Sequence, residues 1–91
     1  MKQLKKAIEE AISGAGIKTA LDQEAAVTFW NNIVGETVSS VTEAERVESG
    51  TLVVRVETSV WRQELQMQKK EIIKKINKKI GTKAIRDIRF I

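Results

Sequence analysis

The chain has 91 residues, enough for one domain with a modest hydrophobic core. It contains no Cys, His or Pro, which excludes disulfides, zinc sites built on Cys or His, haem ligation and Ser-His-Asp catalysis, so we expect no metal and no other cofactor. No apolar run approaches the roughly 20 residues of a membrane span, and Glu9 and Glu10 interrupt any signal-peptide core. These features predict a cytoplasmic protein with no membrane partner.

Positive charge is concentrated at the end of the sequence. The whole chain has 16 Lys and Arg against 12 Asp and Glu, a net charge of +4. Residues 1–66 carry 7 basic and 10 acidic side chains, a net charge of −3, whereas residues 67–91 carry 9 basic and 2 acidic ones, a net charge of +7. This asymmetry favours a polyanionic partner.

Two helices are predicted before residue 36. Residues 2–12 have apolar side chains at the spacing of an amphipathic helix, and the glycines of residues 14–16 are expected to end it. A second helix is expected over about residues 20–34, because Thr19 and Asp22 resemble a capping box at its start.

A β-hairpin is predicted next. Residues 38–48 form a mediocre strand, Ser49-Gly50 is a turn signal, and residues 51–57 form a better strand because apolar residues alternate along it. One face of that strand carries Leu52, Val54 and Val56.

The third and longest helix is expected over about residues 60–80, capped by Thr58 or Ser59 and ended by Gly81. Its apolar arc contains Trp61, Leu65, Ile72, Ile76 and Ile80. Residues 84–91 are then expected to form a strand with Ile88 and Phe90 on one face.

The order of these elements predicts an α+β domain. Two N-terminal helices occupy residues 1–35, and residues 36–91 form a ββαβ unit in which a small three-stranded sheet packs against the long helix. No linker, repeat or low-complexity segment divides the chain, so residues 1–91 are expected to form a single domain.

Eight basic side chains on the third helix and after it form the candidate nucleic-acid-binding surface. They are Lys70, Lys74, Lys75, Lys78, Lys79, Lys83, Arg86 and Arg89. Lys70, Lys74 and Lys78 recur every four residues on the third helix, opposite its isoleucine face. There they could bind a phosphate backbone through counterion release. A solvated lysine-rich face that keeps the protein soluble is the alternative. The absence of aromatic residues from this surface argues against base stacking.

The two tryptophans are interpreted differently. Trp30 fits the apolar stripe of its helix and is expected in the core. Trp61 begins the third helix directly after a strand, where it either belongs to the core or, with Glu64 beside it, anchors a protein partner.

Three segments in order resemble the DciA (DUF721) family over about residues 26–90. They are Trp30–Gly35 (WNNIVG), the run from Gly50–Val56 (GTLVVRV) to Ser59–Leu65 (SVWRQEL), and an ending with Asn77, Gly81 and Asp87–Phe90. The family is that of a bacterial loader of the replicative DnaB-type helicase. The resemblance implies a KH-like fold without the nucleotide-clamping loop, and binding to that helicase and to DNA, single- or double-stranded. It also implies no enzymatic activity.

The same resemblance assigns roles to individual positions. Trp61 occupies the family's central tryptophan, as a helicase-contact or fold-critical residue, and Gly35, Gly50 and Gly81 occupy its turn positions.

The resulting hypothesis is a non-enzymatic DNA-binding adaptor, cytoplasmic and associated with the nucleoid, that assists helicase loading in DNA replication. The sequence has no Walker A motif for ATP hydrolysis, and no small-molecule substrate is expected. Two alternatives stay open: a general KH-like RNA-binding module, and a protein-interaction domain with no nucleic-acid role.

Overall fold

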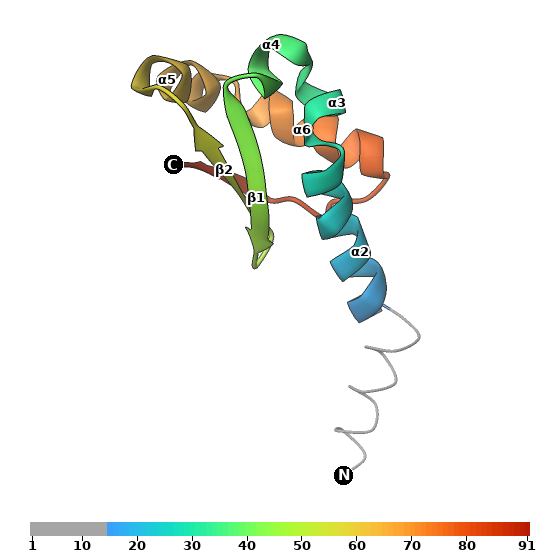
Figure 1. Cartoon of the computed structure of the whole chain (residues 1–91). Coiled ribbons are helices and arrows are strands. Elements are labelled where there is room, and N and C mark those ends of the chain that lie inside the picture. Colours follow the sequence, from blue (N-terminus) through green and yellow to red (C-terminus); the bar gives the residue numbers. More distant parts are fainter. Residues whose placement is uncertain (1–14) are drawn as a thin grey trace, which may run out of the picture.

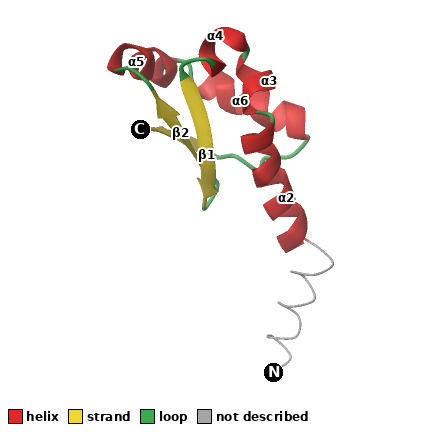
Figure 2. Cartoon of the chain, in the orientation of Figure 1, coloured by secondary structure: helices red, strands yellow, loops and turns green. Residues whose placement is uncertain are grey.

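The computed structural model describes residues 15–91, which form an α+β arrangement of five helices and a three-stranded mixed sheet (Figures 1 and 2). The sequence predicted this class. The helix predicted over residues 2–12, and the glycine expected to end it at position 14, lie outside the described residues.

Helix α2 spans Ala15–Thr28, so residues before the predicted start of the second helix, near residue 20, are already helical. Gly16 and Thr19 both lie inside α2, so the predicted glycine stop at position 16 and the predicted Thr19 cap are wrong. A glycine inside a helix costs only about 1 kcal/mol relative to alanine, which packing can offset. Asp22, the other half of the predicted box, instead accepts hydrogen bonds from Lys18 Nζ at 3.4 Å and Thr82 Oγ1 at 3.1 Å.

Two short helices follow, α3 (Trp30–Val34) and α4 (Glu36–Ser39). The predicted helix over residues 20–34 is therefore interrupted at Phe29, just where the next side chain enters the core. Trp30 is 1% exposed, as predicted, and its indole Nε1 donates to Thr42 Oγ1 at 2.9 Å. That bond gives the buried indole N–H a partner.

The sheet has the order β1-β2-β3, with β1 (Thr42–Glu48), β2 (Thr51–Val56) and β3 (Asp87–Phe90). β1 is antiparallel to β2, and β3 is parallel to β2. The predicted hairpin is confirmed: Ser49 and Gly50 have φ values of 50° and 82°, the two positive angles of a type I′ turn. The first strand begins later than the predicted residue 38, because residues 36–39 are helical.

The long helix predicted over residues 60–80 is divided into α5 (Ser59–Met67) and α6 (Lys69–Ile80). Gln68 separates them, with φ −97° and ψ 4°, and its N–H donates to the Leu65 carbonyl oxygen at 3.1 Å. Its neighbours include no Gly or Pro. Both helices contact β3, but α5 also contacts β2 whereas α6 contacts α2 and α3, so the two halves pack against different elements on either side of the break. The predicted Thr58 cap is confirmed by its Oγ1, which accepts from Trp61 N at 3.2 Å.

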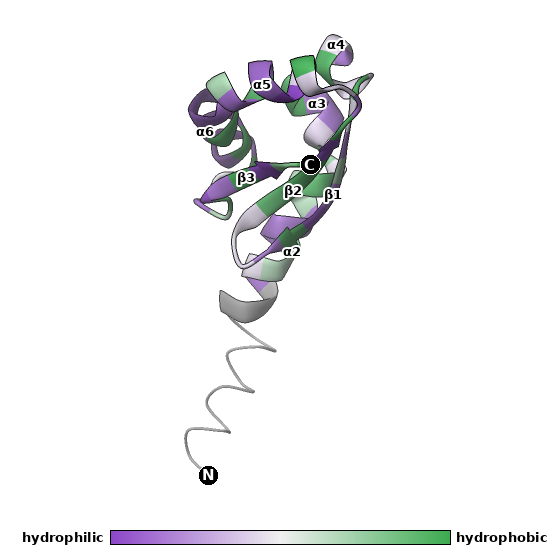
Figure 3. Ribbon diagram, turned by 90° about the vertical axis from the view of Figure 1, so that its left-hand side faces the viewer, coloured by the Kyte–Doolittle hydropathy of each residue, from purple (hydrophilic) through white to green (hydrophobic). Residues whose placement is uncertain are grey.

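The two faces of the sheet differ in what covers them. The inner face lies against the helices, and its buried side chains join those of α3, α5 and α6 in one cluster. The cluster includes Trp30, Leu52, Val54, Leu65, Ile72, Ile76, Ile88 and Phe90. Because successive strand residues point to opposite faces, Arg46, Val53 and Arg89 lie on the outer face. Figure 3 shows hydrophobic residues along β2 and hydrophilic residues along much of α6.

Candidate nucleic-acid interface

Helix α6 turns a row of lysines away from the core. Ile72 and Ile76 are buried on its inner side, and the lysines at the other positions of each turn are exposed. These lysines, here called the α6 lysine face, are Lys70, Lys74, Lys75, Lys78 and Lys79. Within residues 15–91, none of the five has a carboxylate within 4.0 Å, so the positive charge of this face is not neutralised by an ion pair of the described chain.

One edge of the α6 lysine face borders a shallow groove between α3 and α6. The groove has a volume of about 450 Å³ and is lined by Asn32 and Ile33 from α3 and by three of the lysines, Lys75, Lys78 and Lys79. The lysine stems and Ile33 give it an apolar floor, while the ammonium groups supply the charge. A phosphate backbone lying along α6 could contact both the row and this groove.

Lys83 and Arg86 do not lie on α6. They line a separate cleft of about 460 Å³ between α2, the hairpin turn and the loop after α6. Lys18 of α2 lines the same cleft, and no sequence pattern indicated it, because it is a single lysine in the less basic part of the chain.

Arg89 lies on a third surface, the outer face of the sheet. Its strand neighbours Ile88 and Phe90 are buried on the inner face, against α6, so Arg89 points to the opposite side. The eight basic residues selected from the sequence therefore fall into three groups rather than one surface. The alternation of apolar and polar side chains along residues 87–90 could have shown that Arg89 is separate from the helix lysines.

Comparison with known families gives a match over residues 3–90 to the family described as Dna[CI] antecedent, DciA. The chain belongs to the DciA family. Membership in this family indicates a helicase-loader-related role in replication. The family consists of loaders or adaptors that are not known as enzymes. A comparison with curated proteins finds no match.

The glycines that the DciA resemblance assigned to turns have backbones that require such a residue. Gly35, Gly50 and Gly81 have φ values of 87°, 82° and 90°, where a side chain is disfavoured. Gly81 ends α6 in the left-handed conformation, and its N–H donates to the Asn77 carbonyl oxygen at 2.8 Å. These DciA positions are therefore structural.

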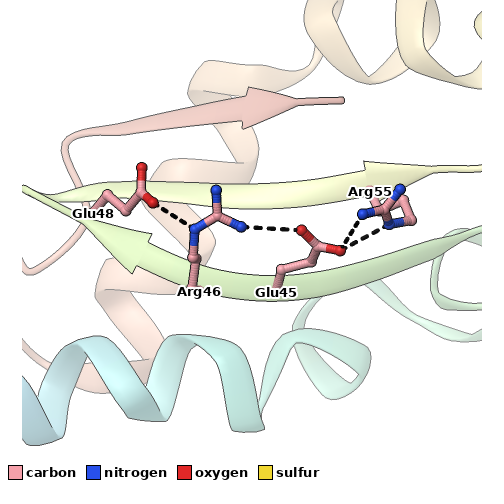
Figure 4. Close-up of polar contacts among 4 residues, drawn as sticks. All are labelled: Glu45, Arg46, Glu48 and Arg55. Carbon is pink, nitrogen blue, oxygen red and sulfur yellow. Dashed lines mark hydrogen bonds and ion pairs between the residues drawn. The ribbon is translucent and has the colours of Figure 1, made fainter.

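The outer face of the sheet carries charges that pair with one another (Figure 4). Arg55 Nη2 lies 2.7 Å from Glu45 Oε2, and Arg46 contacts both Glu45 and Glu48. The hydrogen bond to Glu48 raises the pKa of Arg46 and, from the other side, lowers the pKa of Glu48. This surface resembles the α6 lysine face in cation content but not in net charge.

A similar pair closes the edge of the sheet. Lys69 Nζ donates to Asp87 Oδ1 at 3.1 Å, and this hydrogen bond, with a second from the Ile88 N–H, lowers the pKa of Asp87. Lys69 is thus the lysine of α6 that has an ion-pair partner within residues 15–91. Its position beside the apolar arc matches its half-buried side chain.

The candidate protein-contact residues of this DciA member lie on α5. Trp61 is half-buried and packs against the core cluster, so it contributes to the fold while keeping some exposed area. Glu64 is exposed and accepts a hydrogen bond from Gln68 Nε2 at 2.8 Å. Val60 and Met67, seven residues apart on one side of α5, are 76% and 79% exposed, which the sequence reasoning did not single out.

Residues 15–91 contain no group of three or more acidic side chains placed to hold a metal ion. None of the helices in the same range is both long and apolar enough to cross a membrane.

Proposed function

We propose that this DciA-family protein is a non-enzymatic adaptor that binds the DNA backbone through the α6 lysine face and helps to place the DnaB-type replicative helicase on DNA. The observation that carries the proposal is five exposed lysines on one helix with no ion-pair partner in residues 15–91. Like charges four residues apart destabilise a helix, so this row does not serve the fold. A polyanion would relieve the repulsion and release counterions.

We also infer that β1-β2-α5-α6-β3 represents a KH-like fold in which the crossover helix is divided in two. The parallel pairing of β2 with β3 across that crossover supports the inference. The chain has no Gly-x-x-Gly clamp loop, so the proposed contact uses side-chain charge rather than the clamp of nucleotide-binding KH domains.

The helicase contact is assigned to α5, at Trp61 and Glu64. Its support is the exposed part of Trp61 beside Glu64, with Val60 and Met67 adding apolar area on the same helix. An adaptor of this type needs no ATPase, because holding ring and strand together raises their effective concentration. Its place in the cell would be the cytoplasm, at the nucleoid.

The first test is a low-salt titration of a labelled oligonucleotide with the protein and with Lys70→Glu/Lys74→Glu/Lys78→Glu. The triple variant is expected to lose binding while its unfolding transition is retained. Unchanged affinity would contradict the proposed interface. Competition among single-stranded DNA, duplex DNA and structured RNA identifies the polymer, and a clear preference for RNA would favour the RNA-binding alternative.

The helicase part is tested by purifying the tagged protein from its native cell. Recovery of the replicative helicase supports the adaptor role, and Trp61→Ala together with Glu64→Lys should reduce it. Recovery that survives high salt while DNA binding is undetectable would instead favour a protein-interaction domain without a nucleic-acid role.

A further inference from the structure

The cleft beside the hairpin turn is built from three segments that are distant in sequence. Lys18 and Asp22 come from α2, Ser49 and Gly50 form the hairpin turn, and residues 82–86 form the loop between α6 and β3. Its volume of about 460 Å³ can hold more than a single inorganic ion. Its lining has no aromatic residue, so it offers no platform for base stacking.

The guanidinium of Arg86 is held in position by the turn. Its Nη2 donates to the Ser49 carbonyl oxygen at 2.6 Å, and the Arg86 backbone N–H donates to the Gly50 carbonyl oxygen at 2.8 Å. The side chain lies directly over Gly50, where a Cβ would come within 2.6 Å of Nε. Arg86 is therefore preorganised, and it still has donors that the turn does not use.

The loop that carries Lys83 is fixed at both ends. Thr82 Oγ1 donates to Asp22 Oδ2 at 3.1 Å. The Asn77 side chain donates to the Ile85 carbonyl oxygen at 2.9 Å and accepts from the Ile85 N–H at 3.1 Å. These contacts hold the loop against α2 and α6.

The charge of the cleft favours an anion. Its lining contains three cations, Lys18, Lys83 and Arg86, and one carboxylate, Asp22. That carboxylate already accepts from Lys18 and Thr82, so it offers little to an incoming cation. Lys83 follows Lys79 of the α6 lysine face by four residues, across the Gly81 cap, which brings the cleft next to the end of that face.

We propose that this cleft binds one phosphate group of the nucleic-acid backbone that lies along α6, with Arg86 as the fixed donor and Lys83 and Lys18 as flanking cations. The inference rests on the proposed function and deepens it, because it divides binding between a flexible lysine row and a preorganised contact at its end. The contact is sequence-independent, because phosphates carry no base identity.

The test compares Lys18→Gln/Lys83→Gln with Arg55→Gln/Arg89→Gln in the full chain. Each pair removes two cations. In each pair one cation, Lys18 or Arg55, has a carboxylate partner within residues 15–91, and the other has none. Neither pair changes Arg86 or its contacts with the turn. Affinity for an oligodeoxythymidine is measured across a salt series. The cleft pair is expected to weaken binding several-fold and to reduce the slope of log affinity against log salt by about 0.7, while the outer-face pair changes neither. Equal effects of the two pairs would overturn the inference.

A second measurement separates this inference from the proposed function. Backbone amide spectra are recorded during titration with the same oligonucleotide and with inorganic pyrophosphate. Shifts at Gly50, Lys83 and Arg86 with both ligands, and along α6 with the oligonucleotide alone, are expected. Shifts confined to α6 would overturn the cleft assignment and keep the proposed function. Shifts in the cleft with pyrophosphate and none with the oligonucleotide would overturn the assignment to a nucleic-acid backbone, and with it the proposed function.

Discussion

The α6 lysine face and the outer face of the sheet both carry several cations, and they differ in what surrounds those cations. On the sheet, Arg46 and Arg55 contact Glu45 and Glu48, so β1 and β2 pair these two cations, whereas Arg89 of β3 has no ion pair within residues 15–91. On α6, Glu71 is the single acidic residue of a helix with six lysines, and five of those lysines have no ion pair in the described chain. A cation count alone therefore does not distinguish the two faces, whereas the number of cations without a local carboxylate partner does.

The difference between the two faces also affects the stability of the fold. Charges paired on a sheet surface contribute modestly to the fold, while like charges repeated along a helix oppose it. Replacements on the two faces should therefore change stability in opposite directions.

The largest effect on stability is expected from Gly50→Ala. The substitution places a Cβ at a φ of 82° and 2.6 Å from Arg86 Nε, so it should lower the free energy of unfolding by more than about 1 kcal/mol. Gly81→Ala is the matched control, because its φ is 90° and nothing lies within 4 Å of its Cβ. Urea unfolding of both variants isolates the contact with Arg86, and equal losses would show that Arg86 is not held over the turn.

A moderate effect is expected from the Arg55–Glu45 pair. A double-mutant cycle with Arg55→Gln and Glu45→Gln should give a favourable coupling of about 0.2–1 kcal/mol, since the pair lies at a largely exposed surface. Urea unfolding provides the four free energies. A coupling of zero would remove the contrast between the two faces.

A smaller effect of opposite sign is expected from Lys74→Gln. Lys74 lies four residues from both Lys70 and Lys78, and these two repulsions outweigh its one attraction, to Glu71 three residues before it. Removing its charge should raise the free energy of unfolding by a few tenths of a kcal/mol, about the value of one such helix pair. Added salt should reduce the gain, and a loss of stability would contradict the interpretation of this row as unneeded by the fold.

The smallest effect is expected from pH at Asp87. Its pKa is lowered in the folded state, chiefly by the hydrogen bond from Lys69, so the stabilisation is present above the ordinary Asp pKa and is lost as pH falls through the folded-state value. Asp87→Asn keeps an acceptor for the Ile88 N–H but loses the charge. The variant should be slightly less stable at neutral pH and equal to the unmodified protein in acid. A difference that persists in acid would point to another cause.

Elements set by local chemistry were predictable from the sequence. The Ser49-Gly50 turn, the Thr58 cap and the Gly81 helix end depend on residues whose preferences act over a few positions. The period of the apolar residues also identified Trp30 and the inner face of β2 as core.

Elements that depend on tertiary packing could not be predicted from the sequence. The break at Gln68 follows from α5 and α6 meeting different parts of the fold, and a periodic apolar stripe looks the same whether or not it is broken. The prediction of a helix cap at Thr19 was wrong because the residues of α2 before Thr19 are already helical.

The candidate site shows the same division. The lysines of α6 were found together because helical spacing places them together, and the separation of Arg89 was available from strand alternation. Lys18 joins Lys83 and Arg86 only through the tertiary fold, so no local pattern could reveal it.

The most direct test of the central claim compares two triple variants that lose the same charge. Lys70→Gln/Lys74→Gln/Lys78→Gln neutralises the α6 lysine face, and Arg46→Gln/Arg55→Gln/Arg89→Gln neutralises the outer face. The measurement is the slope of log affinity against log salt for a single-stranded oligonucleotide. The account predicts that the slope falls by about 2 for the α6 variant, about 0.7 per lost phosphate contact, and is unchanged for the sheet variant. Equal falls would show that net charge, and not the α6 lysine face, determines binding.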